Sequence, residues 1–381
     1  MTTIINGSSP SITFSDGSAQ TSATRPFLNR LINGNFVIDQ RNAGASVTPA
    51  NLAYTLDRWK AEISTASKFS VQQSSTAPAG FNNSLLITSS SAYTVGAADY
   101  FAMCQPIEGY NIADLGFGTA NAKTVTISFW VRSSVTGTYS AVIVNQNDTR
   151  VYPFTYTINS ANTFEYKTVT IPGDTTGTWL TTNGAGIRVN FYIGLGTNFQ
   201  GAVNAWNGGT IYGASGTTNL VSTNGATLYL TGVQLEVGST ATSFDYRPYG
   251  TELSLCQRYY ETSYNQGSTP QVVPTNTANS YTFLSSGSNT IGGGSGTAQQ
   301  TMGPYFYKVT KRAVPTVTIY SYTSSATSVA SNGWTGADLA ASTGSLGDNY
   351  AYGFTLINSS GGNVTTGGYG IIFGYASSAE L

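Results

Sequence analysis

The side chains that could do chemistry in this chain are carboxylates, amides and aromatic rings, because histidine is absent. Without imidazole the chain lacks the usual general base at neutral pH and the commonest transition-metal ligand. Pairs of a histidine with a serine or cysteine nucleophile are thereby excluded. We expect no enzymatic activity, no catalytic residue, no metal and no cofactor. A glycan hydrolase built on two carboxylates is the alternative, and its acids would come from Asp57, Asp99, Glu108, Asp114, Asp148, Glu165 and Asp174.

A long glycine-rich segment over residues 197–225 carries the aromatic and amide side chains that could bind a sugar. An aromatic face that stacks on a sugar ring, with amides directed to the hydroxyls, is the chemistry of a lectin-like site. Long ordered loops between strands are often functional. We therefore predict a carbohydrate-binding site at Asn204, Trp206, Asn207 and Tyr212. The alternative is that Trp206 fills a local hydrophobic gap or contacts another subunit.

These side chains must be positioned by strands, because the composition is that of an all-β protein. Charged residues make up only 9%, whereas glycine (43), tyrosine (25) and phenylalanine (17) are abundant, and this mixture favours short strands joined by tight turns. The clearest strand is KTVTISFWVR, where Val125, Ile127, Phe129 and Val131 alternate with polar residues. About ten such strands within residues 27–248, LINGNFVIDQRNAG among them, predict a two-sheet sandwich.

The strand over residues 227–237 and the segment after it divide the chain. Apolar residues occupy both alternating faces of this strand, which predicts a central position in its sheet. Pro248 and Gly250 then stop the β pattern, and residues 250–265 have the composition of a short helix. The sequence thus predicts three parts: an extended segment over 1–25, a β-sandwich over 26–249 and a smaller C-terminal β module over 250–381 that begins with the helix.

Charge and cysteine content limit the partners. The 16 basic and 17 acidic residues nearly cancel, so no electrostatic footprint for nucleic acid or an anionic membrane exists. No apolar run approaches the roughly 20 residues of a membrane helix. Two cysteines, Cys104 and Cys256, cannot make a disulfide framework, which favours assembly in a reducing cytoplasm. The run from Asn145 to Asp148 offers oxygen ligands for calcium, although a turn held by amides explains it better.

Several short motifs resemble bacteriophage tail-fibre and receptor-binding proteins. The junction ELSLCQRYYE matches their E-L-x-L-C-Q-R-Y-Y run, and NGNFVIDQR with YTLDRW is similar to their N-G-D-F-x-I-W-Q-R and Y-x-x-D-R-W runs. Asp39 stands where that family usually has tryptophan. The runs SITFSDGSAQTSA, FYKVTKRAVPTVTIY and YASSAEL resemble the start and the end of the same proteins, with Ser15 in place of a proline. Residues 133–225 show no such motif.

The resemblance implies a structural protein of the virion, assembled in the host cytoplasm and released by lysis. It implies a carbohydrate-binding-like jelly roll over 26–249, a homotrimer, and a tail fibre that mediates host attachment through a surface polysaccharide. The segment 1–25 would attach the fibre to other virion proteins, through Ile12, Phe14, Asp16 and Gly17. The alternative is a capsid, neck or head-fibre protein that decorates the particle without a specific receptor.

Overall fold

The structure is a computed structural model. It describes residues 27–270, 300–321, 329–332, 338–343, 349–358 and 370–381, and short strands at 4–5, 12–13, 19–20 and 281–284. The predicted attachment residues Phe14, Asp16 and Gly17 lie outside the described residues, and only the backbone of Ile12 is described. No helix in the described part of the chain is long and apolar enough to cross a membrane.

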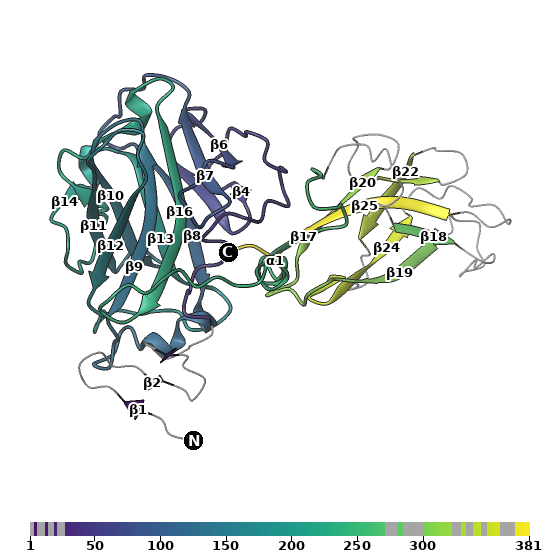
Figure 1. Ribbon diagram of the computed structural model, residues 1–381. Coiled ribbons are helices and arrows are strands. Elements are labelled where there is room, and N and C mark those ends of the chain that lie inside the picture. Colours follow the sequence, from purple (N-terminus) through teal and green to yellow (C-terminus); the bar gives the residue numbers. More distant parts are fainter. Residues whose placement is uncertain are drawn as a thin grey trace.

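Two antiparallel sheets, in which the strand order differs from the sequence order, form the larger unit. This unit is an all-β sandwich, as predicted (Figure 1). The six-stranded sheet has the order β11 (Val151–Ile158), β10 (Gly137–Asn145), β13 (Ala185–Leu195), β8 (Tyr100–Glu108), β5 (Trp59–Ile63) and β4 (Tyr54–Leu56). The five-stranded sheet has the order β12 (Glu165–Ile171), β9 (Val125–Ser133), β16 (Thr227–Val237), β7 (Ser84–Ser89) and β6 (Phe69–Ser74).

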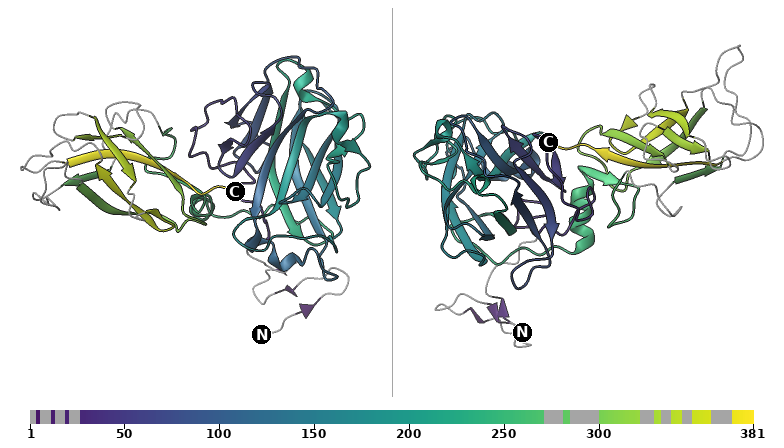
Figure 2. Two further views of the ribbon diagram at one scale, coloured as in Figure 1. Left: turned by 180° about the vertical axis from the view of Figure 1, so that it is seen from behind. Right: turned by 90° about the horizontal axis from the view of Figure 1, so that it is seen from above.

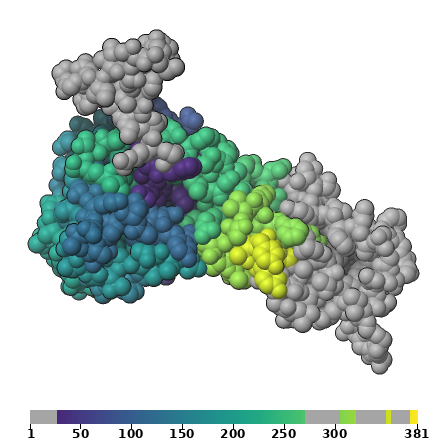
Figure 3. Space-filling model, turned by 90° about the horizontal axis from the view of Figure 1, so that it is seen from below, coloured from purple at the N-terminus to yellow at the C-terminus, as the bar shows by residue number. Residues whose placement is uncertain are grey.

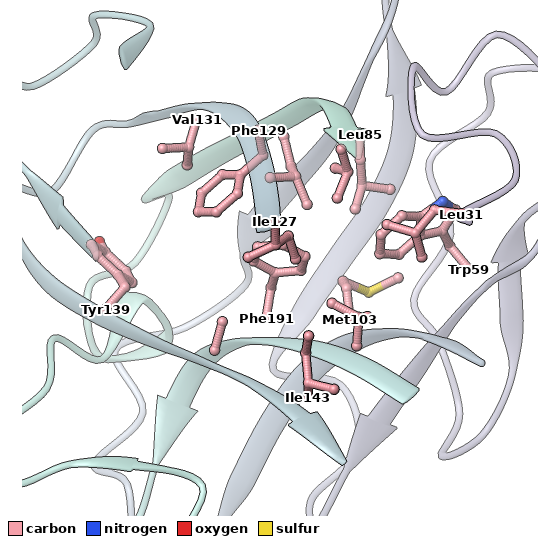
Figure 4. Close-up of a cluster of buried hydrophobic side chains, with 14 of the residues drawn as sticks. Leu31, Trp59, Leu85, Met103, Ile127, Phe129, Val131, Tyr139, Ile143 and Phe191 are labelled. Carbon is pink, nitrogen blue, oxygen red and sulfur yellow. The ribbon is translucent and has the colours of Figure 1, made fainter. Parts of the chain in front are cut away.

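The core lies between these sheets and is built from their inward-facing apolar residues. On β9 the predicted inward residues, Val125, Ile127, Phe129 and Val131, are all fully buried. Phe129 meets Phe191 of the opposite sheet edge-to-face, with ring centroids 5.0 Å apart (Figure 4). Burial of an aromatic or branched side chain of this kind stabilises the fold by about 1.5–3 kcal/mol. The alternation seen in the sequence therefore marks the core face of this strand.

Strand β16 is central in its sheet, as predicted. Its buried apolar residues do not lie on two faces, however, because a bulge turns them all toward one core. Its register against β9 shifts between Thr231 and Gln234, so the strand contains a β-bulge. A bulge adds one residue and reverses which alternate residues face inward. Leu228 and Leu230 before the bulge, and Val233 and Leu235 after it, consequently all enter the same core.

One predicted strand is wrong. The run LINGNFVIDQ contains no strand and follows an irregular path, in which Asn33 and Phe36 have left-handed φ angles of 57° and 55°. The Asn33 side chain holds this path: its Nδ2 donates to the Ile38 carbonyl (2.8 Å) and its Oδ1 accepts from the Ile38 amide (3.0 Å). A buried amide that bonds its own neighbouring backbone replaces the ladder of a strand.

Helix α1 (Tyr249–Gln257) begins after Pro248 and leads into the smaller C-terminal β unit (Figures 1 and 2). The predicted helix over 250–265 is too long, because the chain returns to a strand at Tyr260. The buried Glu252 accepts from Arg247 (3.2 Å), so a carboxylate sits in the first turn, where the helix dipole favours it. The strands of this unit are β17 (Tyr260–Thr262), β18 (Tyr281–Leu284), β19 (Gln300–Phe306), β20 (Thr316–Ser321), β21 (Val329–Asn332), β22 (Asp338–Thr343), β23 (Asn349–Tyr350), β24 (Gly353–Asn358) and β25 (Gly370–Ser378).

The two units meet at a charged joint, where residue 381 also lies (Figure 1). Glu380 pairs with Arg41 (2.7 Å) and with the fully buried Arg58 of the sandwich. The Arg58 guanidinium also lies 3.6 Å from the ring centroid of Tyr259. Figure 3 shows described residues of the C-terminal unit, in lime green, beside the sandwich. Buried pairs of this kind define one arrangement of the two units, because an unpaired partner would be costly.

A second pair of contacts closes the same joint. Arg258 makes a two-pronged ion pair with Glu108 of β8, at 2.7 and 3.0 Å, and the Tyr259 hydroxyl donates to the same carboxylate at 2.6 Å. Burial raises the pKa of Glu108, but these hydrogen bonds outweigh it and the pKa is lowered. The junction motif is therefore a packing element between the units.

Both cysteines are buried and free. Cys104 lies on β8 within the sandwich, and Cys256 lies on α1. Burial raises the pKa of each thiol well above its ordinary value, which disfavours the reactive thiolate. Neither residue is part of a disulfide.

Candidate functional site

Part of the long glycine-rich segment over residues 197–225 folds over the outer face of the six-stranded sheet and forms an aromatic wall there. The parallel pair β14 (Gln200–Gly201) and β15 (Gly213–Ala214) pins the insertion, and the Tyr212 amide donates to the Phe199 carbonyl at 2.7 Å. The Tyr212 ring stacks on Tyr192 of β13 and on Phe199, with centroids 5.8 and 5.6 Å apart. Tyr100 of β8 meets the edge of Phe199 at 5.7 Å.

Polar side chains of the sheet lie beside this wall. Glu62 on β5 accepts from Asn190 of β13 at 2.6 Å and from Arg188 of β13 at 3.1 Å. Ala102 of β8 pairs in register with both Glu62 of β5 and Tyr192 of β13, so it lies between these two flanking strands. Because its side chain is only a methyl group, the longer side chains of β5 and β13 can reach each other across β8.

The aromatic and polar groups together enclose an open pocket of about 290 Å³. Asn190 is only 2% exposed, and its Oδ1 has no hydrogen-bond partner among the residues that the structure describes. A buried acceptor left unpaired costs free energy, which a donor from a ligand would recover. The pocket is lined by Asn51, Leu52, Glu62, Tyr100, Asp148, Arg188, Asn190, Tyr192, Phe199 and Tyr212.

The ionisable groups of the pocket are coupled to one another. Arg188 also pairs with Asp148, which comes from the turn between β10 and β11. Burial lowers the pKa of Arg188, but the charges of its neighbours, that of Glu62 foremost, together outweigh burial and the pKa is raised. Burial, followed by the charge of Asp148, raises the pKa of Tyr212 to about 12. The Tyr212 hydroxyl is therefore protonated at neutral pH, and can serve as a hydrogen-bond donor.

Of the four predicted sugar-binding residues, Tyr212 lines this pocket and Trp206 does not. The Trp206 ring packs edge-to-face against Phe117, Tyr152 and Trp179, at centroid distances of 5.8, 5.2 and 5.4 Å. Its Nε1 donates to the Pro172 carbonyl at 2.7 Å. Trp206 thus fills a hydrophobic gap at the edge of the sandwich, which is the alternative that the sequence left open.

The two predicted asparagines lie with Trp206 and not with the pocket. Asn207 pairs its backbone with Val151 of β11, and the Asn204 amide donates to the Pro153 carbonyl at 2.7 Å. The Asn145–Asp148 run is a turn held by amides: Asn145 Oδ1 accepts from the amides of Thr149 (2.9 Å) and Arg150 (3.1 Å). Within the described residues, no group of three or more cysteines and acids could hold a metal ion.

The acids considered for a glycosidase pair are held by separate partners. Asp174 pairs with Arg150 (2.7 Å), Glu165 with Lys167 (2.7 Å) and Asp114 with Arg30 (2.7 Å). Glu108 belongs to the joint. Asp57 accepts from Gln40, and Asp99 accepts from Ser64, Tyr93 and the Gly96 amide. Asp148 is the member of this set that lines the pocket.

Sequence reasoning missed the sheet residues of the pocket, although a signal for them exists. On β13, Val189, Phe191 and Ile193 face the core, so the alternate residues Arg188, Asn190 and Tyr192 must face outward. A bulge between Tyr192 and Gly194 moves Leu195 to the outer cluster, so the alternating apolar residues of this strand do not all lie on the core face. The pattern along one strand cannot predict which outward residues of different strands contact one another, because that depends on strand order and register.

No known protein family matches the chain, and no similarity to a curated protein sequence was found. Among solved structures, the chain is similar to the enzymatically active domain of tailspike protein 4 from bacteriophage CBA120 (TM-score 0.32, 12% identity, 56% of this chain). That match spans 22% of the tailspike chain. It is also similar to a family 61 carbohydrate-binding module in complex with β-1,4-galactotriose (TM-score 0.29, 12% identity, 56% of this chain and 100% of the module).

A third similarity is to the family 11 carbohydrate-binding module from Clostridium thermocellum, in complex with a β-1,3-1,4-mixed-linked tetrasaccharide. The TM-score is 0.27 at 15% identity, over 52% of this chain and 98% of the module.

Proposed function

We propose that this protein is a carbohydrate-binding fibre protein of a bacteriophage virion, which attaches the particle to a glycan on the host surface. The observation that carries the proposal is the open pocket on the six-stranded sheet. It combines the aromatic rings of Tyr100, Phe199 and Tyr212 with carboxylate and amide groups, and it holds the Asn190 Oδ1 acceptor, which has no partner in the described part of the chain. Aromatic surface for a sugar ring and convergent polar groups for its hydroxyls are what glycan recognition needs.

The binding at one such pocket would be weak, since the pocket is small and open. A fibre that presents three copies raises the overall affinity through effective concentration, provided that the glycan spans more than one pocket. A homotrimer on the virion, attached through residues 1–25, would supply this multivalency.

The motif resemblance supports the fibre part of the proposal. Arg41 of NGNFVIDQR, Arg58 of YTLDRW, Tyr259 of ELSLCQRYYE and Glu380 of YASSAEL are far apart in the sequence, yet they meet at the joint. These motifs therefore belong to one structural feature, the connection between the sandwich and the C-terminal unit. A rigid connection suits a fibre that must carry load during attachment.

A glycan array printed with bacterial capsular and O-antigen oligosaccharides tests the proposal. We expect the full chain to bind a subset of these glycans, and Tyr212→Ala to weaken that binding at least tenfold, because it removes ring surface and a hydroxyl donor. The matched control is Tyr166→Ala, an exposed tyrosine on β12 of the other sheet, which should bind like the wild type. Absence of binding by the wild-type chain, or equal binding by Tyr212→Ala, would contradict the glycan site.

Two further outcomes separate the alternatives. Normal adsorption by particles that lack the whole protein would favour decoration of the capsid or neck. Release of reducing sugar from a bound polysaccharide would show a hydrolase. Labelling of particles with an antibody to this chain would locate it on the tail, the neck or the capsid.

A further inference from the structure

The guanidinium of Arg188 is already ion-paired with two carboxylates that line the same pocket. Arg188 is the cationic residue among the described lining residues, and its side chain is 14% exposed. Its NH1 donates to Glu62 at 3.1 Å, and its NH2 donates to Asp148. Tight recognition of a carboxylate or phosphate uses both terminal nitrogens of a guanidinium as a fork. Here each terminal nitrogen already has a carboxylate partner from the protein.

The remaining charge of the pocket is that of the acids. Glu62 and Asp148 face Arg188 from two different elements, so the lining carries two carboxylates and one guanidinium. Lys60 lies 3.8 Å from Glu62, but it does not line the pocket, and its Nζ also lies 3.4 Å from the Leu381 carbonyl. An anionic ligand would therefore meet carboxylate oxygens, and no cation among the described lining residues is free to balance them. Like charges in a partly buried site repel more strongly than they do in water.

The free hydrogen-bonding capacity of the pocket favours a ligand that both donates and accepts. Among the described residues, Asn190 Oδ1 is an unpaired buried acceptor and Arg188 Nε is an unpaired buried donor, and the carboxylate oxygens of Glu62 and Asp148 can accept from further donors. A sugar hydroxyl both donates and accepts, whereas a carboxylate or phosphate substituent supplies acceptors only. The polar groups therefore match a neutral sugar.

On the basis of the proposed function, we propose that the pocket selects uncharged sugars and discriminates against sugars that carry a carboxylate or phosphate group. The Glu62–Arg188–Asp148 set acts as a filter: the acids supply acceptors for hydroxyls, and they keep Arg188 from binding an acidic substituent. The charge selectivity is thus set by Glu62 and Arg188 of the sheet together with Asp148 of the turn between β10 and β11.

Matched pairs of oligosaccharides test this filter. The probes are short glucose oligomers and the corresponding glucuronic acid oligomers, printed as neutral and acidic partners beside the array glycans, with affinities measured for every pair that binds. We expect the wild-type chain to bind the neutral partner at least tenfold more tightly. The double variant Glu62→Gln, Asp148→Asn frees Arg188 and should narrow or reverse this preference.

Two variants control the interpretation. Glu165→Gln removes a carboxylate that pairs with Lys167 on β12 of the five-stranded sheet, whereas the pocket lies on the six-stranded sheet. This variant should keep the wild-type preference. Asp148→Asn alone, at a more exposed position in a turn, should raise the relative affinity for acidic partners if the double variant fails to fold. A wild-type chain that binds acidic partners as well as neutral ones would overturn the filter while the glycan site stands. A chain that binds no glycan would overturn both.

Discussion

Arg58 is a guanidinium buried at the joint between the two units, with its side chain only 1% exposed. It pairs with Glu380, donates to the Pro106 carbonyl at 2.6 Å and covers the ring of Tyr259 at 3.6 Å. Removal of one partner of a buried pair leaves the other charge without compensation, which costs far more than loss of a surface pair. Single residues at the joint are therefore expected to decide the stability of the connection.

We predict that Arg58→Met lowers the free energy of unfolding by about 3 kcal/mol, the low end for breaking a buried pair, because Arg41 still holds Glu380. Denaturant unfolding monitored by tryptophan fluorescence measures this change. The matched control is Arg30→Met, whose pair with Asp114 is partly exposed and should contribute less than about 1 kcal/mol. Equal effects of the two substitutions would show that the buried pair does not stabilise the joint.

At the scale of elements, the bulge in β16 allows a central strand to bury apolar residues before and after it on one face. Gly232 occupies the bulge with φ of 60°, a conformation that residues with a Cβ atom rarely adopt. A Cβ added there would also meet Phe81 Cζ at 2.6 Å. Phe81 packs on Phe244 and Tyr246, so it has little freedom to move away.

We predict that Gly232→Ala destabilises the sandwich by the left-handed penalty of about 1–2 kcal/mol, plus a steric cost of about 1–3 kcal/mol. Gly225→Ala separates the two contributions, because Gly225 has φ of 72° and no atom within 4 Å of an added Cβ. Thermal unfolding of both variants should show the larger loss of stability, measured as the fall in the unfolding midpoint temperature, for Gly232→Ala. Similar losses would mean that Phe81 moves aside without cost.

At the scale of the whole molecule, the pocket and the joint lie on different parts of the structure. The pocket is on the outer face of the six-stranded sheet, whereas α1 and β17 connect to the sandwich through Glu108 and Arg58. The proposed binding pocket and the joint between the units therefore use separate residues. Variants of the pocket should change glycan binding while the joint stays intact.

We predict that deletion of residues 1–25 leaves a soluble, folded oligomer that no longer joins the virion, because the described core of the sandwich is built from residues between Leu31 and Leu235. Light scattering after size-exclusion chromatography measures the oligomer, for which we expect three chains. Immunoblots of purified particles measure incorporation, with the full chain as the control. Normal incorporation of the shortened chain would rule out this segment as the attachment site.

Much of the fold could be predicted from local pattern. The all-β class follows from composition, and the core face of β9 follows from alternation between Val125 and Val131. The same reasoning failed at LINGNFVIDQ, where the Asn33 side chain replaces a strand ladder. It also failed across the bulges of β13 and β16, since one extra residue reverses the inward face.

The sequence by itself determined that this chain is rich in strands and has no histidine chemistry, because both depend on residue types and near neighbours. Only the tertiary structure decided which side chains meet. Glu62, Asp148 and Arg188 come from three separate elements, and Trp206 packs into the sandwich while Tyr212 reaches the pocket. The physical reason is that these contacts depend on strand order and register across the sheet, which spacing along the chain does not record.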